Sequence, residues 1–276
     1  MQLGTIRTDD GTTAVRVDGE EVVQLSFDDV GEILREGSLE YAGRAKGDRL
    51  PLSSVDWAPV VVEPNKIICV GMNYADHVAE MGNVAPAHPT CFAKFSGSLI
   101  GAYDKIHLPS PDVSLQNDWE AELAIVIGTE VRSVSPQSAV NYVAGYTAMN
   151  DFSVRDWQKR TSQFLMGKSW EHSTALGPVM TTTDQLGNGS NLSIGSAVNG
   201  VEKQASNTSQ LVFDVPFLVS ELSKMITLLP GDIIATGTPG GVGAGRSPQE
   251  WLIPGDELTV TIDGIGEIRN RCVIPQ

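Results

Sequence analysis

The chain of 276 residues is poor in cysteine, histidine, aromatic side chains and positive charge. Its cysteines, Cys69, Cys91 and Cys272, are odd in number and form no C-x-x-C pair, so the sequence indicates neither a disulfide framework nor a zinc site. Lys and Arg number 19 against 34 Asp and Glu, which gives a formal net charge of −15. This balance disfavours nucleic acid and anionic membrane surfaces as partners, because phosphate binding depends on clustered lysine and arginine.

Several signatures of localisation and catalysis are also missing. No apolar run approaches the ~20 residues of a membrane span, and residues 1–17 lack the apolar segment of a signal peptide, so we expect a cytoplasmic protein. The glycine-rich stretch 237–245, GTPGGVGAG, lacks the Gly-Lys-Ser/Thr ending of a P-loop and does not match G-x-G-x-x-G. It either forms a plain turn or brings backbone N–H groups and the Thr238 hydroxyl to a substrate carboxylate. No G-x-S-x-G elbow is present, which disfavours an α/β-hydrolase triad.

What the sequence does contain indicates a mainly β, α+β protein. It has 28 glycines and 15 prolines, and the expected strands outnumber the expected helices. Residues 1–64 are predicted to form a small N-terminal domain, with Asp-Gly hairpin turns and a linker over 50–64. Residues 65–276 are predicted to form the main domain.

The stretch DWEAELAIVIG, residues 118–128, predicts a strand over 119–128 whose second half, 123–127, is an unbroken apolar run. Glu120 and Glu122 precede that run. On a strand their side chains point to the same face, ~6.5–7 Å apart. Two carboxylates placed in this way repel each other unless a positive group lies between them.

A third carboxylate can join this pair, because Asp151 ends another predicted strand, 145–150. Three carboxylates brought together provide oxygen ligands for Mg²⁺ or Mn²⁺ and leave coordination positions open for water or substrate. The alternative is that Glu120 and Glu122 lie on the solvated face of an edge strand. Asp118 is in phase with them, but its place at the strand mouth predicts a cap or turn residue.

Other candidate residues follow from spacing. His77 and Glu80 face the same way on a predicted helix, and a carboxylate beside a histidine suits a general base that activates water. A surface His–Glu pair is the alternative. Lys168 is either a partly buried cation that stabilises developing negative charge or a surface lysine. Arg155 follows Asp151 by four residues and can pair with it on a helical turn.

The order of these motifs resembles the fumarylacetoacetate hydrolase family. The resemblance runs from about residue 66 to 272, and the acidic pair together with 145–158 is its most specific part. The matching segments are GMNYADHVAEMG (71–82), FAK (92–94), DWEAELAIVIG (118–128), VAGYTAMNDFSVRDWQ (143–158), GKSW (167–170) with LGP (176–178), and GDIIATGTPGGVG (231–243).

The resemblance implies a mixed, sandwich-like β-roll, a homodimer and one divalent ion, Mg²⁺ or Mn²⁺, per subunit. Carried over residue by residue, it implies metal ligands, catalytic residues and substrate contacts. The metal ligands are Glu120, Glu122 and Asp151, the catalytic residues are His77, Glu80 and Lys168, and the substrate contact is Thr238. Arg155 and Tyr74 are two further candidates for substrate contact.

The chemistry that fits these residues is work on a small 2-oxo acid. We expect hydrolysis of a C–C bond in a 2,4-dioxo acid such as an acylpyruvate, with an enolate stabilised by the metal and a water activated by His77 and Glu80. Decarboxylation of oxaloacetate and isomerisation of a 2-hydroxy-dienedioate are rival reactions of the same site. A metal-dependent binding protein without catalysis is a rival of another class.

Overall fold

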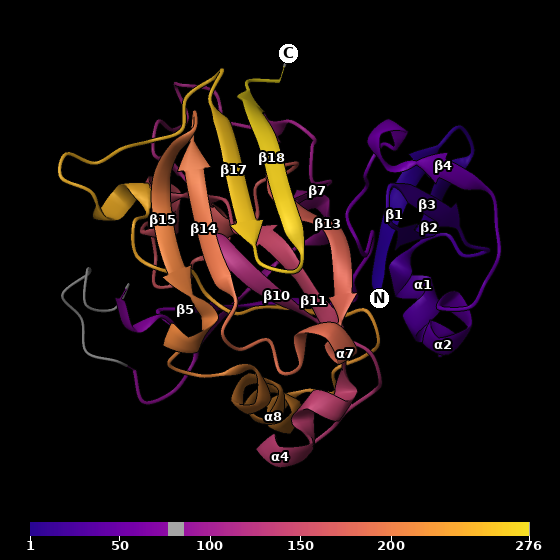
Figure 1. Ribbon diagram of the computed structural model, residues 1–276. Coiled ribbons are helices and arrows are strands. Elements are labelled where there is room, and N and C mark those ends of the chain that lie inside the picture. The colour runs from indigo at the N-terminus through magenta and orange to yellow at the C-terminus, as the bar shows by residue number, and fades with distance from the viewer. Residues whose placement is uncertain (77–85, 276) are drawn as a thin grey trace.

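The computed structural model describes residues 1–76 and 86–275, and two β-sheets organise it (Figure 1). The larger sheet contains, in spatial order, β4 (Arg49–Pro51), β3 (Glu21–Gln24), β2 (Gly11–Asp18), β1 (Gln2–Thr8), β13 (Thr174–Thr182), β11 (Val143–Asn150), β10 (Ala121–Ile127), β16 (Ile233–Ala235), β5 (Ile67–Gly71) and β6 (Thr90–Lys94). β7 (Leu99–Ile100) pairs with β13 outside this path. The smaller sheet contains β15 (Val201–Asn207), β14 (Ser193–Val198), β17 (Glu257–Ile262), β18 (Gly266–Val273) and β8 (Ile106–His107).

Short elements complete the fold, and the mainly β, α+β prediction is confirmed. β9 (Asn117–Asp118) and β12 (Ser153–Val154) form a separate two-stranded ladder. The α-helices of the described residues are α1 (Val30–Arg35), α2 (Leu39–Ala42), α4 (Pro136–Ala139), α5 (Arg155–Gln158), α6 (Leu165–Lys168), α7 (Thr183–Leu186) and α8 (Val215–Met225). The 3₁₀ helices are η1 (Leu52–Ser54), η2 (Ser96–Ser98), η3 (Val140–Tyr142), η4 (Thr208–Gln210) and η5 (Gly243–Gly245). Within the described residues, no helix is long and apolar enough to cross a membrane.

Strand β10 explains the apolar run noticed in the sequence. All seven of its residues are buried, because both faces of the strand are covered. Leu123, Ile125 and Ile127 belong to one hydrophobic cluster, whereas Ala124 and Val126 belong to a second. The alternation that an exposed strand face would impose on the sequence is therefore absent.

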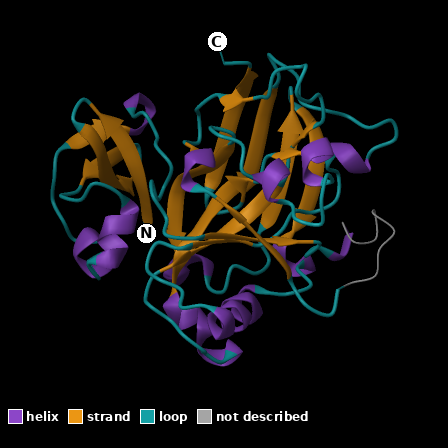
Figure 2. Cartoon of the chain, turned by 180° about the vertical axis from the view of Figure 1, so that it is seen from behind, coloured by secondary structure: helices purple, strands orange, loops and turns teal. Residues whose placement is uncertain are grey.

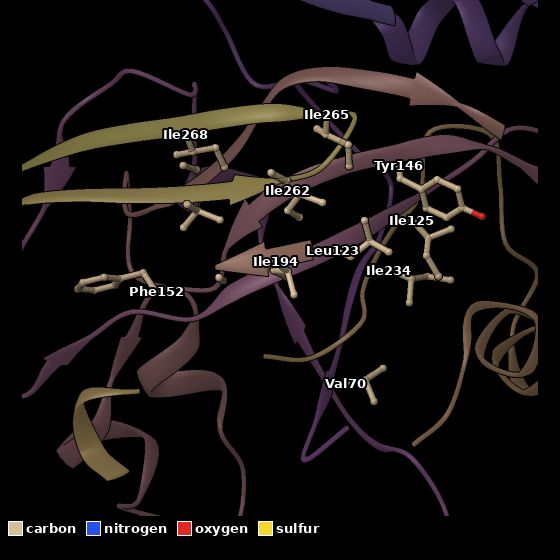
Figure 3. Close-up of a cluster of buried hydrophobic side chains, with 14 of the residues drawn as sticks. Val70, Leu123, Ile125, Tyr146, Phe152, Ile194, Ile234, Ile262, Ile265 and Ile268 are labelled. Atoms are coloured by element: carbon tan, nitrogen blue, oxygen red, sulfur yellow. The ribbon is translucent and has the colours of Figure 1, made fainter. Parts of the chain in front are cut away.

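The first cluster joins the two sheets. It brings residues of β10 together with residues of the smaller sheet, such as Ile194, Ile262 and Ile268. Figure 3 shows these isoleucines pointing toward Leu123 and Ile125 across the space between the sheets. The sheets thus form the sandwich-like arrangement that the resemblance implies.

The second cluster includes residues of the N-terminal lobe, defined here as residues 1–64. Ile33 and Leu34 of α1 belong to it. The lobe lies at one side of the molecule in both views (Figures 1 and 2), and β1 pairs with β13 in register Leu3↔Met180. The lobe therefore extends the larger sheet. Its division from residues 65–276 as a separate domain stays a proposal.

The stretch expected as a linker, 50–64, is packed rather than free. It begins within β4, and Trp57, Val60 and Val61 are all buried. Because these apolar side chains can be removed from water against neighbouring strands, the segment gains more from packing than from remaining mobile. Two of the three prolines that predicted a linker, Pro59 and Pro64, are themselves buried, whereas Pro51 is exposed.

The spacing of apolar residues in the sequence predicts helices over residues 27–36, 135–143 and 214–224. The first two form in shorter versions, as α1 and α4, and the third forms as α8. Asp29 caps α1 by accepting the Glu32 N–H at 2.6 Å, and Asp214 caps α8 by accepting the Phe217 N–H at 2.9 Å. The helix expected over 73–81 falls largely on residues 77–85, which lie outside the described residues. The predicted His77 and Glu80 lie in that segment.

We predict that Gly4→Ala destabilises the protein by ~1–3 kcal/mol, the cost of overpacking a filled site. An added Cβ at Gly4 would lie 2.4 Å from Cζ3 of Trp57 and 3.1 Å from the Pro178 carbonyl oxygen. Gly97→Ala is the matched control, because nothing lies within 4 Å of its added Cβ. Denaturant unfolding measures both variants, and equal stability would show that the lobe does not pack as described.

Candidate active site

Three carboxylates meet where β10 begins and β11 ends. Glu120 immediately precedes β10, Glu122 lies within it, and Asp151 follows β11. The antiparallel register pairs Ala121 with Asn150, and the Asp151 N–H donates to the Glu120 carbonyl oxygen at 2.9 Å. One carboxylate oxygen from each of the three residues lies within 4.8 Å of the others.

All three are buried, with exposures of 6% for Glu120, 1% for Glu122 and 0% for Asp151. The solvated-edge alternative for the two glutamates is therefore wrong, because β10 is an inner strand with β11 and β16 on either side. The structure thus brings together the residues that the sequence predicts as metal ligands.

Two buried lysines approach this cluster. Lys168 Nζ lies 2.8 Å from Glu120 Oε2 and 2.8 Å from Asp151 Oδ2, at the end of α6. Lys94 Nζ, at the end of β6, lies 2.7 Å from Asp151 Oδ1 and donates to the Phe152 carbonyl oxygen at 3.1 Å. Lys168 is 2% exposed, so it is the buried cation and not the surface lysine.

Burial alone would lower the pKa of Lys168, but the charges of Asp151 and Glu120 outweigh this effect and raise the pKa above its ordinary value. Lys168 therefore remains an ammonium group at neutral pH. Lys94 was not singled out from the sequence. The only available signal was its place at a strand end in the FAK segment.

Glu122 has a different environment from its two partners. Its Oε2 accepts the Gly237 N–H at 2.8 Å, which ties the carboxylate to the start of the glycine loop, residues 237–245. Burial raises the pKa of Glu122 well above its usual range, and the charges of Asp151 and Glu120 raise it further. A cation nearby would favour the charged form of this carboxylate instead.

Arg155 forms a second ionic group beside the carboxylate cluster, together with Asp118 and Glu120. Arg155 Nε lies 2.7 Å from Asp118 Oδ2, and its Nη2 lies 2.7 Å from Glu120 Oε1. The helical-turn pairing of Arg155 with Asp151 was therefore a wrong expectation, because Asp151 is engaged by the two lysines. Arg155 also donates from Nη1 to Gln158 at 3.0 Å.

Asp118 is more than a cap or turn residue. It is fully buried, and besides Arg155 it accepts the backbone N–H groups of Trp119, Gly243 and Ala244 at 2.9, 2.6 and 3.0 Å. It therefore connects the strand mouth to the far end of the glycine loop. Sequence reasoning missed this role because the partners are 125 and 126 residues away.

When every carboxyl is ionised, Glu122 included, the charges of these described side chains do not cancel. Asp118, Glu120, Glu122 and Asp151 supply four negative charges, whereas Lys94, Lys168 and Arg155 supply three positive ones. Buried charge is costly unless it is balanced. Three convergent carboxylates with one excess negative charge fit a divalent cation, and hard oxygen ligands suit Mg²⁺ or Mn²⁺.

The cluster opens into a cavity of about 180 Å³. Thr238, Arg155 and Lys168, predicted to act on substrate, all line it. The other described lining residues are Val70, Gly71, Met72, Phe92, Glu120, Glu122, Gln158, Lys159, Phe164, Val242 and Ala244.

Tyr74 does not line this cavity. It is fully buried in the cluster between the sheets and bridges to Leu211, and its hydroxyl has no hydrogen-bond partner among the described residues. Burial and then the charge of Glu122 raise the pKa of its hydroxyl, and the contact of Tyr74 with substrate stays a prediction. His77 and Glu80 lie outside the described residues, and their roles stay predictions.

Comparison with known proteins gives relatives that are enzymes. The chain is 44% identical to the mitochondrial oxaloacetate tautomerase Fahd2a of Rattus norvegicus over 242 residues, which is 86% of this chain and 77% of the relative. A crystal structure of a putative HpcE protein from Mycobacterium smegmatis matches with a TM-score of 0.90 and 34% identity, over 100% of both chains. Maleylpyruvate hydrolase from Sphingobium sp. SYK-6, in complex with manganese(II) and pyruvate, matches with a TM-score of 0.81 and 30% identity, also over 100% of both chains.

We predict that Mn²⁺ raises the melting temperature and that EDTA lowers it. Saturation at ~100 times the dissociation constant would stabilise the folded state by ~2.7 kcal/mol. Glu122→Gln should abolish the shift, because it removes one anionic ligand and leaves the fold intact. Glu130→Gln, at an exposed position, is the control that should keep the full shift. Identical melting curves with ion and chelator would contradict the metal site.

We predict that Asp118→Asn lowers the free energy of unfolding by ~3–5 kcal/mol, the usual cost of leaving a buried charge without its partner. The uncompensated group would be Arg155, and the N–H groups of the glycine loop would lose a charged acceptor. Asp112→Asn, which is exposed, should change stability little. Chemical denaturation distinguishes the two; matching curves would mean that Asp118 is only a turn residue.

A model of a protein family also matches most of the chain. The family model described as fumarylacetoacetate (FAA) hydrolase C-terminal matches residues 66–273, the part that contains every residue of the carboxylate cluster and the glycine loop. With the relatives above, this match establishes the kind of protein. The chain is an enzyme that belongs to the fumarylacetoacetate hydrolase family.

Proposed function

We propose that the protein is a divalent-metal-dependent tautomerase of oxaloacetate or a closely related four- to five-carbon 2-oxo dioic acid. The observation that carries this proposal is the buried Glu120–Glu122–Asp151 cluster with Lys168 at the edge of a small cavity. The name and 44% identity of the rat relative support the choice of oxaloacetate.

Tautomerisation makes limited demands on a site. A proton leaves C3, and the 2-oxo oxygen gains one, so only a C–H and an O–H bond change. The difficulty is the negative charge that develops on the oxygen as the C3 proton leaves. A divalent ion held by Glu120, Glu122 and Asp151 would polarise that oxygen as a Lewis acid.

The side chains of this chain supply the rest. Lys168 lies between the carboxylates of Glu120 and Asp151, which favour its ammonium form, so we assign it the stabilisation of developing negative charge and not proton abstraction. The Thr238 hydroxyl stands on the cavity wall as a neutral donor for a carboxylate. The base that takes the C3 proton is proposed to be His77 oriented by Glu80, as the sequence predicts.

Arg155 receives a different role from the one first expected. Its guanidinium is engaged by Asp118, Glu120 and Gln158, although the side chain lines the cavity. We propose that Arg155 holds Glu120 in place for metal binding. A direct salt bridge to substrate would require it to give up one of these partners.

Hydrolysis of an acylpyruvate-like 2,4-dioxo acid is the second candidate. The observation in its favour is the match to maleylpyruvate hydrolase over the whole chain, a structure that contains manganese and pyruvate. Hydrolysis would need the same stabilisation of an enolate-like charge by Lys168. It would in addition need a water activated by His77, whereas tautomerisation would not.

Two further features belong to the proposal. A homodimer stays a proposal that rests on family resemblance. A cytoplasmic location is also a proposal, and it competes with the mitochondrial location in the name of the rat relative.

The test is an assay of manganese-loaded and metal-stripped protein on the enol form of oxaloacetate and on acetylpyruvate. We predict metal-dependent loss of the enol absorbance, with Lys168→Met reducing kcat at least ~10²-fold, as for removal of a preorganised charge-stabilising group. Lys224→Met, which is largely exposed, should leave kcat unchanged. Metal-dependent cleavage of acetylpyruvate without tautomerase activity would favour the hydrolase, and activity on neither acid would contradict both proposals.

A further inference from the structure

A buried glutamine links β10 to the glycine loop. Gln204 lies in β15 and is 1% exposed. Its Oε1 accepts the Ala121 backbone N–H at 3.0 Å and the Ser196 hydroxyl at 2.8 Å. Its Nε2 donates to the Pro239 carbonyl oxygen and to Thr238 Oγ1, each at 2.8 Å. Both acceptor positions and both N–H groups of the amide are therefore used.

The orientation of this amide is fixed by its backbone partners. The Ala121 N–H can only donate, so it must face the oxygen of Gln204. The Pro239 carbonyl can only accept, so it must face the nitrogen. A flipped amide would place two donors together at one end and two acceptors together at the other, which excludes it.

This orientation determines the polarity of the Thr238 hydroxyl. Because Thr238 Oγ1 accepts a hydrogen from Gln204, its own hydrogen is left for another partner. Thr238 is 4% exposed and lines the cavity with Glu122 and Lys168. The O–H hydrogen is therefore free for a cavity ligand, while one of the two lone pairs of the oxygen is occupied by Gln204.

We propose that Gln204 is a positioning residue that fixes the Thr238 hydroxyl as a hydrogen-bond donor to a carboxylate of the bound acid. This inference rests on the proposed function, in that the ligand is a 2-oxo acid. A carboxylate only accepts hydrogen bonds, so a hydroxyl held as a donor before binding favours it. A hydroxyl free to present its lone pairs would lose that selectivity.

The test uses pyruvate as the probe and calorimetric titration of manganese-loaded protein. Gln204→Glu keeps the size of the side chain but removes both N–H donors, so the new carboxylate takes the Thr238 hydrogen for itself. Pyruvate should bind at least ~10-fold more weakly, as expected when a hydrogen bond to a charged group is lost. Gln210→Glu adds the same charge at an exposed position of η4 and should alter binding by less than ~2-fold.

Introducing Gln204→Glu into a Thr238→Val background separates two effects on binding: the direction of the hydrogen bond at Thr238 and the added negative charge. Without the hydroxyl, Gln204→Glu should weaken pyruvate binding by less than ~2-fold further, because the two side chains act as one unit. Equal weakening in both backgrounds would mean that Gln204 acts through charge or packing, and would overturn the inference. A manganese-dependent melting shift in each variant confirms that the metal site is retained.

A second pair of variants covers the case in which Gln204→Glu does not fold. Thr238→Ser keeps a hydroxyl within reach of Gln204 and should bind pyruvate within ~3-fold of the unsubstituted protein, whereas Thr238→Val should lose at least ~10-fold. Equal affinities of the two variants would overturn the inference. Failure of the unsubstituted protein to bind pyruvate would instead contradict the 2-oxo acid proposal on which the inference rests.

Discussion

The structure depends on the balance of charge in a buried group of carboxylates and cations. Four acidic side chains and three basic ones lie out of water at the end of the central strands. Removing charges from water costs several kcal/mol for each ion, so each must find partners at close range. The ion pairs and hydrogen bonds of this group therefore hold together the segments that meet here. These segments are β6, β10, β11, α5, α6 and the glycine loop. Ionisation of Glu122, whose pKa is raised by burial, leaves one excess negative charge in this group, and a divalent cation among the carboxylate oxygens would balance it.

The glycine loop shows how closely backbone must approach this group. An added Cβ at Gly237 would lie 2.9 Å from Asn73 Cβ and from the Val70 carbonyl oxygen, and one at Gly241 would lie 2.1 Å from the Lys203 carbonyl oxygen. Both residues also have positive φ, 101° and 99°. The glycines thus serve close packing against β5 and β15, and the loop N–H groups serve Glu122 and Asp118. The sequence lacks the glycine patterns of phosphate-binding loops, and the structure gives close packing and positive φ as the reasons for these glycines.

The separation in sequence between interacting residues determines how much of this site could be predicted from the sequence. Glu120 and Glu122 could be found because a strand places alternate residues on one face, and Asp151 could be found because it ends the neighbouring strand. Local periodicity carries that information. Local periodicity gives no information about the partners of Asp118 in the glycine loop, because those residues lie 125 and 126 positions away in the sequence.

Lys94 and Gln204 were missed because their partners also lie far away in the sequence. The fold was for this reason more predictable than the site. Lys94 meets Asp151 from 57 residues away, and Gln204 meets Thr238 from 34 residues away. Strands, turns and helix caps depend on neighbours in sequence, so hairpins and capped helices such as α8 were placed correctly. Spacing gives the face of an element and not what that face meets.

The shared site also explains why related enzymes can carry names of different reactions. Tautomerisation, hydrolysis and decarboxylation of 2-oxo acids all develop negative charge on the 2-oxo oxygen, and a protonated Lys168 beside the carboxylate cluster serves each of them equally. Discrimination must therefore come from groups that act on other parts of the substrate. In our proposal, a hydroxyl fixed as a donor at Thr238 selects for a carboxylate, whereas the base and any activated water act at carbon. The reaction is set by what surrounds the cluster, and the cluster itself sets only the class of acid.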